Sequence, residues 1–197
     1  MKPKEALLIV DLQNDFCAGG ALGIKGTGSI IPVINKYIKI FVSKKLPVLA
    51  TRDWHPKKTG HFKEFGGVWP RHCIKNTKGA AFCPGLRLPE DVILLYKGMD
   101  PEKDSYSAFH AQDKKGRSLL NILRKSGIEE LYIGGLATDY CVKFTTRDAL
   151  KKRLKVKILS DAVKGVNLEP GDSEDAIRQI VKLGAKKTTF RKAVYKI

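Results

Sequence analysis

The stretch "YIGGLATDYCVKF", residues Tyr132 to Phe144, joins a short apolar run to a pattern typical of a helix. The apolar run ends in glycines, and Cys141 follows about one turn into the helical pattern. A thiol at such a junction is either a small core residue or a nucleophile that faces a pocket. The stretch predicts a strand followed directly by a helix, the unit from which parallel sheets are built.

The same alternation of apolar runs and helical patterns continues along the chain. Strands are predicted at 6–10, 47–50, 92–96, 131–134, 156–159 and 188–195, and helices at 29–41, 117–125, 139–151 and 172–183, with Ser29 and Thr138 as N-caps. Continuous apolar strands that alternate with helices predict a parallel sheet covered on both faces. We therefore expect an α/β protein: a single domain over residues 1–197, built as a three-layer α/β/α sandwich around a six-stranded, mostly parallel sheet.

The composition is that of a globular protein with one sizeable core. The chain has 197 residues, of which 43% are hydrophobic and 29% charged. No apolar run approaches the roughly 20 residues of a membrane helix, and the apolar stretch near the N-terminus is too short for a signal peptide. We expect a cytoplasmic protein without a membrane partner. Its four cysteines show no CxxC spacing, so we expect all of them to be thiols: Cys17, Cys73, Cys83 and Cys141.

The net charge of +17 is unusual and raises the question of nucleic-acid binding. Lys and Arg cluster in "KKRLKVK" (151–157) and "KKTTFRK" (186–192), and basic surfaces attract RNA through counterion release. No RNA-binding signature with interleaved aromatic residues accompanies these clusters. We interpret them as solvated faces and expect no specific nucleic-acid partner.

Reactive side chains stand at or just beyond the ends of four predicted strands. They are Asp11, Asp53, Lys97 and Cys141. Because ligands of open parallel sheets bind beyond the carboxyl ends of the strands, these side chains are expected to meet at one edge. A nucleophilic cysteine, a lysine that stabilises its thiolate and an aspartate that shuttles the proton point to acyl transfer. At a helix start beside an ammonium, Cys141 is expected to be unusually acidic.

An irregular segment at about 54–90 interrupts the alternation and carries most of the histidines. With Asp53 it supplies a D-x-H-x5-H-x10-H pattern: Asp53, His55, His61 and His72. Imidazoles with one carboxylate suit zinc, iron(II) or manganese, and an open coordination position permits catalysis. The alternative is a polar loop with scattered histidines.

Several motifs together resemble one known family. "LLIVDLQNDFCAGGAL", "TRDWHP", "GHF", "WPRHC", "YKG" and "GLATDYCVKFTTRDAL" resemble, in order and spacing, the nicotinamidases (pyrazinamidases) of the isochorismatase-like cysteine hydrolase family. The resemblance covers nearly the whole chain. It implies hydrolysis of nicotinamide to nicotinate and ammonia, together with activity on pyrazinamide. The implied triad is Asp11, Lys97 and Cys141, and the implied ligands of one divalent metal, zinc first with iron or manganese as alternatives, are Asp53, His55, His61 and His72.

The resemblance also implies roles for the backbone and the pocket walls. It places a cis peptide before Ala137 and assigns the oxyanion hole to the N–H groups of Ala137 and Cys141. The implied residues around the substrate ring are Phe16, Leu22, Trp69, Tyr106 and Ala137. Tyr140 stands where some nicotinamidases have histidine, which leaves that part of the pocket open. The resemblance does not fix the oligomeric state.

Two other functions remain to be weighed. One is a same-fold amidohydrolase that acts on a carbamoyl or ureido substrate; the metal set argues against it, because a ring nitrogen is what makes an anchoring metal useful. The other is a basic RNA-binding protein with a vestigial site, against which the intact triad argues.

Overall fold

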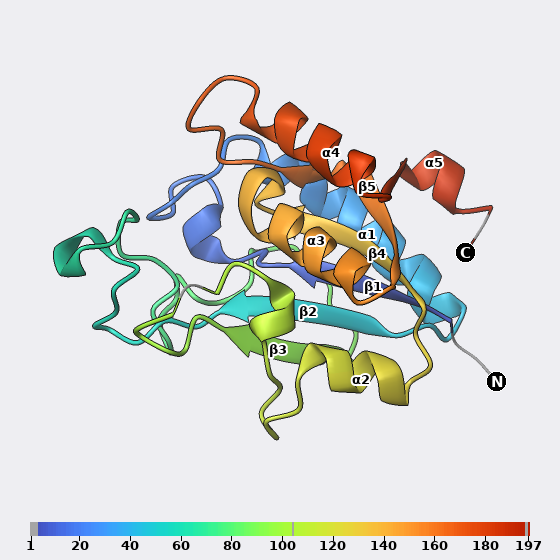
Figure 1. Ribbon diagram of the computed structural model, residues 1–197, viewed down its shortest axis with the longest axis horizontal. Coiled ribbons are helices and arrows are strands. Elements are labelled where there is room, and N and C mark those ends of the chain that lie inside the picture. Colours follow the sequence, from blue (N-terminus) through green and yellow to red (C-terminus); the bar gives the residue numbers. More distant parts are fainter. Residues whose placement is uncertain (1–3, 104, 196) are drawn as a thin grey trace.

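The protein is built around one six-stranded sheet, described in a computed structural model for residues 4–103, 105–195 and 197. The strand order is β3-β2-β1-β4-β5-β6, and every neighbouring pair is parallel. The strands are β1 (Glu5–Val10), β2 (Val48–Asp53), β3 (Ile93–Lys97), β4 (Glu130–Leu136), β5 (Lys155–Lys164) and β6 (Lys186–Thr188). Figure 1 shows helices on both faces of this sheet.

One face is covered by α1 (Thr27–Ser43) and α5 (Phe190–Ala193), and the other by α2 (Leu119–Lys125), α3 (Lys143–Lys151) and α4 (Asp172–Lys182). Short 3-10 turns form at η1 (Asn14–Phe16), η2 (Lys63–Phe65) and η3 (Ala108–His110), and a π-helical turn, η4 (Thr138–Val142), leads into α3. In the part of the chain that the structure describes, no helix combines the length and apolar character needed to cross a bilayer.

Strand β1 shows why the sheet is covered on both sides. Leu7 and Ile9 pack into the core beneath α1, whereas Ala6, Leu8 and Val10 pack into the core beneath α2 and α3. Because successive side chains of a strand point to opposite faces, a strand that is apolar at every position must be buried on both. The predicted α/β/α sandwich with a parallel sheet is confirmed.

The C-terminal segment differs from the prediction of a strand at 188–195. The strand β6 ends at Thr188, and the chain then turns into α5. The Phe190 N–H donates to the Asp161 carboxylate over 2.7 Å, and the Phe190 ring packs edge-on against Tyr37 of α1 at 5.2 Å. The turn places this ring against the buried side chain of Tyr37.

Helix α1 also begins earlier than predicted. It starts at Thr27 after Gly26, which has a left-handed backbone with φ of 84°, so Ser29 lies inside the first turn and is not the N-cap. The Ser29 hydroxyl instead donates to the Gly26 carbonyl over 2.8 Å.

The expectation of four thiols is wrong, because Cys17 and Cys83 form a disulfide with a Cα–Cα distance of 6.6 Å. Backbone hydrogen bonds hold the two segments together: Asn14 N–H donates to Ala81 O over 2.8 Å, and Cys83 N–H to Leu12 O over 2.9 Å. The spacing of 66 residues carries no local signal for this pairing. Cys73 and Cys141 are free.

This disulfide predicts a thiol count and a stability change. Thiol titration of the protein denatured without reductant should find Cys73 and Cys141 only. The Cys17→Ser/Cys83→Ser variant should lose about 2–4 kcal/mol of unfolding free energy, because its unfolded chain regains the freedom of a long closed loop. Reductant should lower the stability of the parent protein and leave the double variant unchanged. Four titratable thiols in the parent would contradict the pairing.

Candidate active site

Asp11 lies just beyond β1 and is fixed by two neighbouring strands. Its backbone has φ of 48°, a left-handed conformation that is uncommon for a residue with a side chain and often marks functional sites. The Thr51 hydroxyl donates to Asp11 Oδ1 over 2.6 Å and accepts from the Asp11 N–H over 3.2 Å. The other carboxylate oxygen, Oδ2, lies 2.9 Å from Lys97 Nζ. The Asp11 carboxylate therefore points along the carboxyl edge of the sheet toward Lys97.

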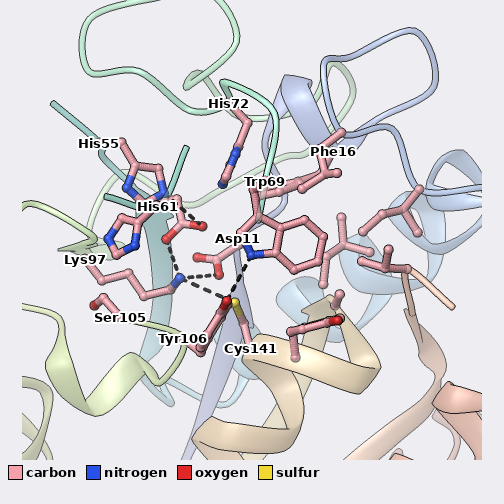
Figure 2. A pocket seen from close by; sticks show the side chains of 17 residues that line it. Asp11, Phe16, His55, His61, Trp69, His72, Lys97, Ser105, Tyr106 and Cys141 are labelled. Carbon is pink, nitrogen blue, oxygen red and sulfur yellow. Dashed lines mark hydrogen bonds and ion pairs between the residues drawn. The ribbon is translucent and has the colours of Figure 1, made fainter. Parts of the chain in front are cut away.

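Lys97 ends β3 and is 1% exposed. Its ammonium forms ion pairs with Asp11 and Asp53 and lies 3.5 Å from the Sγ atom of Cys141 (Figure 2). Burial alone would lower the pKa of Lys97, but the carboxylates and the thiol group outweigh it and raise this pKa well above its usual value. Lys97 is therefore a permanent cation at the centre of the site.

Cys141 is presented by the π-helical turn η4, which follows the cis peptide Leu136–Ala137. The expected α-helical start with a Thr138 side-chain cap does not form; Ala137 is the N-cap residue, and its carbonyl accepts from the Val142 N–H over 3.0 Å. A backbone hydrogen bond between residues five apart replaces the α-helical bond between residues four apart at this turn. The structure thus places Cys141 beside Lys97 by a local geometry that the sequence pattern did not predict.

Gly135 lets β4 and β1 approach where this turn begins. Its φ is 113°, and a Cβ atom added there would lie 2.1 Å from the Val10 carbonyl oxygen. A side chain at this position would push apart the strands that lead to Asp11 and Cys141.

The thiol of Cys141 is less acidic than expected. Burial raises its pKa well above the ordinary value; Lys97 opposes this shift, while Asp11 and Asp53 add to it. The expectation of an acidic thiol is therefore wrong, because desolvation and nearby carboxylates outweigh one ammonium. The pKa of Asp11 is itself raised, by burial first, against the lowering effect of Lys97. A neutral thiol thus faces a carboxylate that is more basic than usual.

Asp53, His55 and His72 form a cluster suited to a divalent cation. One ligand atom from each lies within 4.8 Å of the others. His55 Nδ1 lies 3.0 Å from Gly98 O and His72 Nδ1 lies 2.8 Å from Pro70 O. A ring nitrogen that donates to a carbonyl leaves Nε2 as the free ligand atom.

The charge states of this cluster fit the same chemistry. Burial lowers the pKa of His72, which favours the neutral imidazole that binds metals. Burial would raise the pKa of Asp53, but Lys97 and the nearby imidazoles outweigh it and hold that pKa well below its usual range. The donor set is one carboxylate with neutral imidazoles, as divalent metal sites require.

His61 lies next to this cluster but is not one of the three residues whose ligand atoms converge within 4.8 Å. Its ring is buried, and its centroid is 4.9 Å from that of His55 (Figure 2). Three of the four predicted ligands thus meet at one point, and the fourth lines the same cavity.

Two further residues fix the loops that carry these ligands. Asp15 accepts from the Cys73 N–H over 2.7 Å and so anchors the chain next to His72. Gly98 makes room for His55, because an added Cβ atom would lie 2.5 Å from the His55 Cε1 atom. Neither contact has a signature in the sequence.

Apolar and aromatic side chains close one cavity around these groups. All five residues expected to surround a substrate line it: Phe16, Leu22, Trp69, Tyr106 and Ala137. The Trp69 indole N–H donates to the Tyr106 hydroxyl over 2.9 Å. The cavity has further lining residues that sequence reasoning did not assign: Ile24, Ser105, Leu136 and Val166. Tyr140, the position at which the sequence left the pocket open, also lines the cavity and packs against Trp69 with ring centroids 4.9 Å apart.

Comparison with known proteins identifies the class to which this fold and site belong. The isochorismatase domain model matches residues 5–191, and the chain belongs to the isochorismatase family. It is 42% identical to the nicotinamidase of Escherichia coli (strain K12), over 93% of each chain, and 37% identical to the nicotinamidase/pyrazinamidase of Mycobacterium tuberculosis, over 83% of this chain and 88% of that protein. The crystal structure of pyrazinamidase of Pyrococcus horikoshii in complex with zinc superposes with a TM-score of 0.88 at 45% identity, covering 95% of this chain and 100% of that one.

The electrostatics of Cys141 predict how fast it is alkylated. In metal-free protein, the iodoacetamide rate at Cys141 should keep rising with pH beyond the range of an ordinary thiol, because its pKa is raised. Lys97→Met removes the ammonium that opposes this shift and should slow the reaction at pH 7. Peptide mapping by mass spectrometry separates Cys141 from Cys73. A rate at Cys141 that is already maximal at pH 7 in the parent protein would contradict this electrostatic account.

Proposed function

We propose that this chain is a metal-dependent cysteine amidohydrolase that converts nicotinamide to nicotinate and ammonia, and that it hydrolyses pyrazinamide as well. The observation that carries the proposal is the contact of Lys97 with both Asp11 and Cys141 beside a divalent-metal cluster, in one cavity lined by aromatic residues. The named activities of the bacterial relatives support the same substrate class.

Substrate binding would use the two halves of the cavity. Phe16 and Trp69 offer apolar walls for a flat heteroaromatic ring. Asp53, His55 and His72, with His61 beside them, would hold the metal, for which we propose zinc on the precedent of the Pyrococcus horikoshii structure. A metal held by these residues would supply Lewis-acid chemistry toward a ring nitrogen of the substrate.

The chemical steps then use the chain's own groups. Asp11 takes the proton from Cys141 Sγ as the sulfur attacks the carboxamide carbon. The carbonyl oxygen becomes an oxyanion, which the backbone N–H groups of Ala137 and Cys141 would stabilise; such donors typically contribute a factor of about 10² or more. Lys97 stays protonated throughout and balances the charge that moves between Asp11 and the sulfur.

The intermediate collapses in two stages. Asp11 returns its proton to the amide nitrogen, so that the C–N bond breaks, ammonia leaves and a thioester remains on Cys141. Asp11, again a carboxylate, then takes a proton from water as the water oxygen attacks the thioester. Breaking the C–S bond releases nicotinic acid, which ionises to nicotinate in solution, and the proton held by Asp11 returns to the sulfur.

The direct test is hydrolysis of nicotinamide by the purified, metal-loaded protein, measured as ammonia and nicotinate in equal amounts. Cys141→Ala should reduce turnover to background while thermal stability changes little. A carbamoyl or ureido amide tested in parallel should be hydrolysed much more slowly. No release of ammonia from nicotinamide by the metal-loaded protein would overturn the proposal.

The metal role predicts a contrast between two histidine variants. Chelation should abolish turnover, and readdition of zinc should restore it. His55→Ala should lower turnover by about 100-fold or more, because one coordinating group is lost. His110→Ala is the matched control, since His110 is exposed and lies outside the cluster, and its turnover should equal that of the parent. Full activity after verified metal removal would refute the role assigned to the metal.

A further inference from the structure

A buried carboxylate on the catalytic turn has no part in the chemistry described above. Asp139 lies between Ala137 and Cys141 in η4 and is 4% exposed. It is not one of the residues that line the cavity. Its Oδ1 accepts from the Val166 N–H over 3.0 Å, and its Oδ2 accepts from the Asn167 N–H over 2.7 Å. Both oxygens thus bind the backbone of one loop.

That loop supplies a wall of the active-site cavity. Val166 lines the cavity from the side of β5 and α4. Asn167 has φ of 52°, a conformation that is uncommon for a residue with a side chain, and its Oδ1 accepts from the Ser173 N–H over 2.9 Å at the start of α4. Asn167 therefore ties the loop both to Asp139, through its backbone, and to the start of α4, through its side chain.

Close packing leaves little room for the loop to adjust. A Cβ atom added to Gly165 would lie 2.0 Å from Ser173 Oγ and 2.9 Å from Asp139 Oδ1. The loop backbone therefore lies directly against the Asp139 carboxylate. Two hydrogen bonds to the Asp139 side chain join the backbone of Val166 and Asn167 to the turn that carries Cys141.

Hydrogen bonds from backbone N–H groups to a carboxylate are strong, and a buried carboxylate is tolerated only when it receives such bonds. A carboxamide at this position could accept one of the two bonds. Its NH₂ group would then face the second backbone N–H, donor against donor. Asp139→Asn therefore changes the placement of the loop while it keeps the size and shape of the side chain.

We propose that Asp139 is a positioning residue for the amide hydrolysis, whose carboxylate holds the Val166 wall at a fixed distance from the turn that carries Cys141. The inference rests on the proposed function for its kinetic readout. It assigns Asp139 no proton transfer and no contact with substrate. Its effect is on how well the ring is held in reach of the thiol.

The test compares Asp139→Asn with Asp161→Asn. Asp161 is a matched control, because its carboxylate also joins two elements but does not line the cavity. It accepts from the Tyr37 hydroxyl over 3.0 Å and from the Phe190 N–H over 2.7 Å. Asp139→Asn should raise the KM for nicotinamide about tenfold or more. Asp161→Asn should lower the melting temperature and leave KM and kcat unchanged. Parent values of both constants in folded Asp139→Asn would overturn the proposal.

Hydrogen exchange provides a readout that does not depend on turnover. The amides of Val166 and Asn167 should be protected in the parent and exchange faster in Asp139→Asn, while amides of β1 keep the parent rate. If the parent protein has no nicotinamidase activity, the proposed function is refuted. Hydrogen exchange would still report whether Asp139 holds the backbone of Val166 and Asn167. If both amides exchange at the parent rate in Asp139→Asn, the claim that the Asp139 carboxylate holds this loop in place is overturned.

A double-mutant cycle separates positioning from general destabilisation. If Asp139 acts through Val166, the effects of Asp139→Asn and Val166→Ala on kcat/KM should be strongly non-additive, because the second change finds the wall already displaced. Additive effects would show that Asp139 acts by another route. If Asp139→Asn does not fold, Asp139→Glu keeps the charge with one more methylene and should fold with a raised KM. An unchanged KM in that variant would overturn the proposal.

Discussion

A single buried ammonium joins the parts of this site. Lys97 is 1% exposed and contacts the carboxylates of Asp11 and Asp53 as well as the sulfur of Cys141. A buried charge is tolerated only when it is paired, and here its two partners are carboxylates that would repel each other without it. Asp11 lies beside the thiol of Cys141, and Asp53 belongs to the cluster with His55 and His72 that is suited to a divalent cation. The proton-transfer half and the metal half of the site are therefore held together by one cation.

The sheet brings these groups together. Asp53 of β2 and Lys97 of β3 are partners in the parallel register. Asp11 follows β1 and η4 follows β4, and these two strands also pair with each other. Because all strands are parallel, their carboxyl ends share one edge. The groups to which we assign the chemistry therefore converge without long loops to carry them. The irregular segment at 54–90 adds the histidines and Trp69 over this edge, as Figure 1 shows for the loops beside β2 and β3.

The sequence was sufficient for the features that follow from periodicity. Apolar runs indicated the strands, and the residues at their ends indicated the site, since the carboxyl ends of parallel strands lie at one edge of the sheet. Features that depend on tertiary contacts were not predictable in this way. The Cys17–Cys83 disulfide requires two distant loops to meet, and the π-helical turn differs from an α-helical start by one hydrogen bond.

The acidity of Cys141 was mispredicted for a related reason: the ammonium is visible in the sequence, but the burial that outweighs it is not. A thiol that stays protonated at rest makes the proposed mechanism depend on Asp11, to which we assign removal of the proton as the sulfur attacks. The central claim is that this attack forms a thioester. Acid-quenched reactions of the metal-loaded protein with nicotinamide, analysed by mass spectrometry, test it most directly. The account predicts a nicotinoyl group on the peptide that contains Cys141 and none on the peptide that contains Cys73. Steady turnover with no acylated Cys141 at any time, together with an active Cys141→Ala variant, would contradict it.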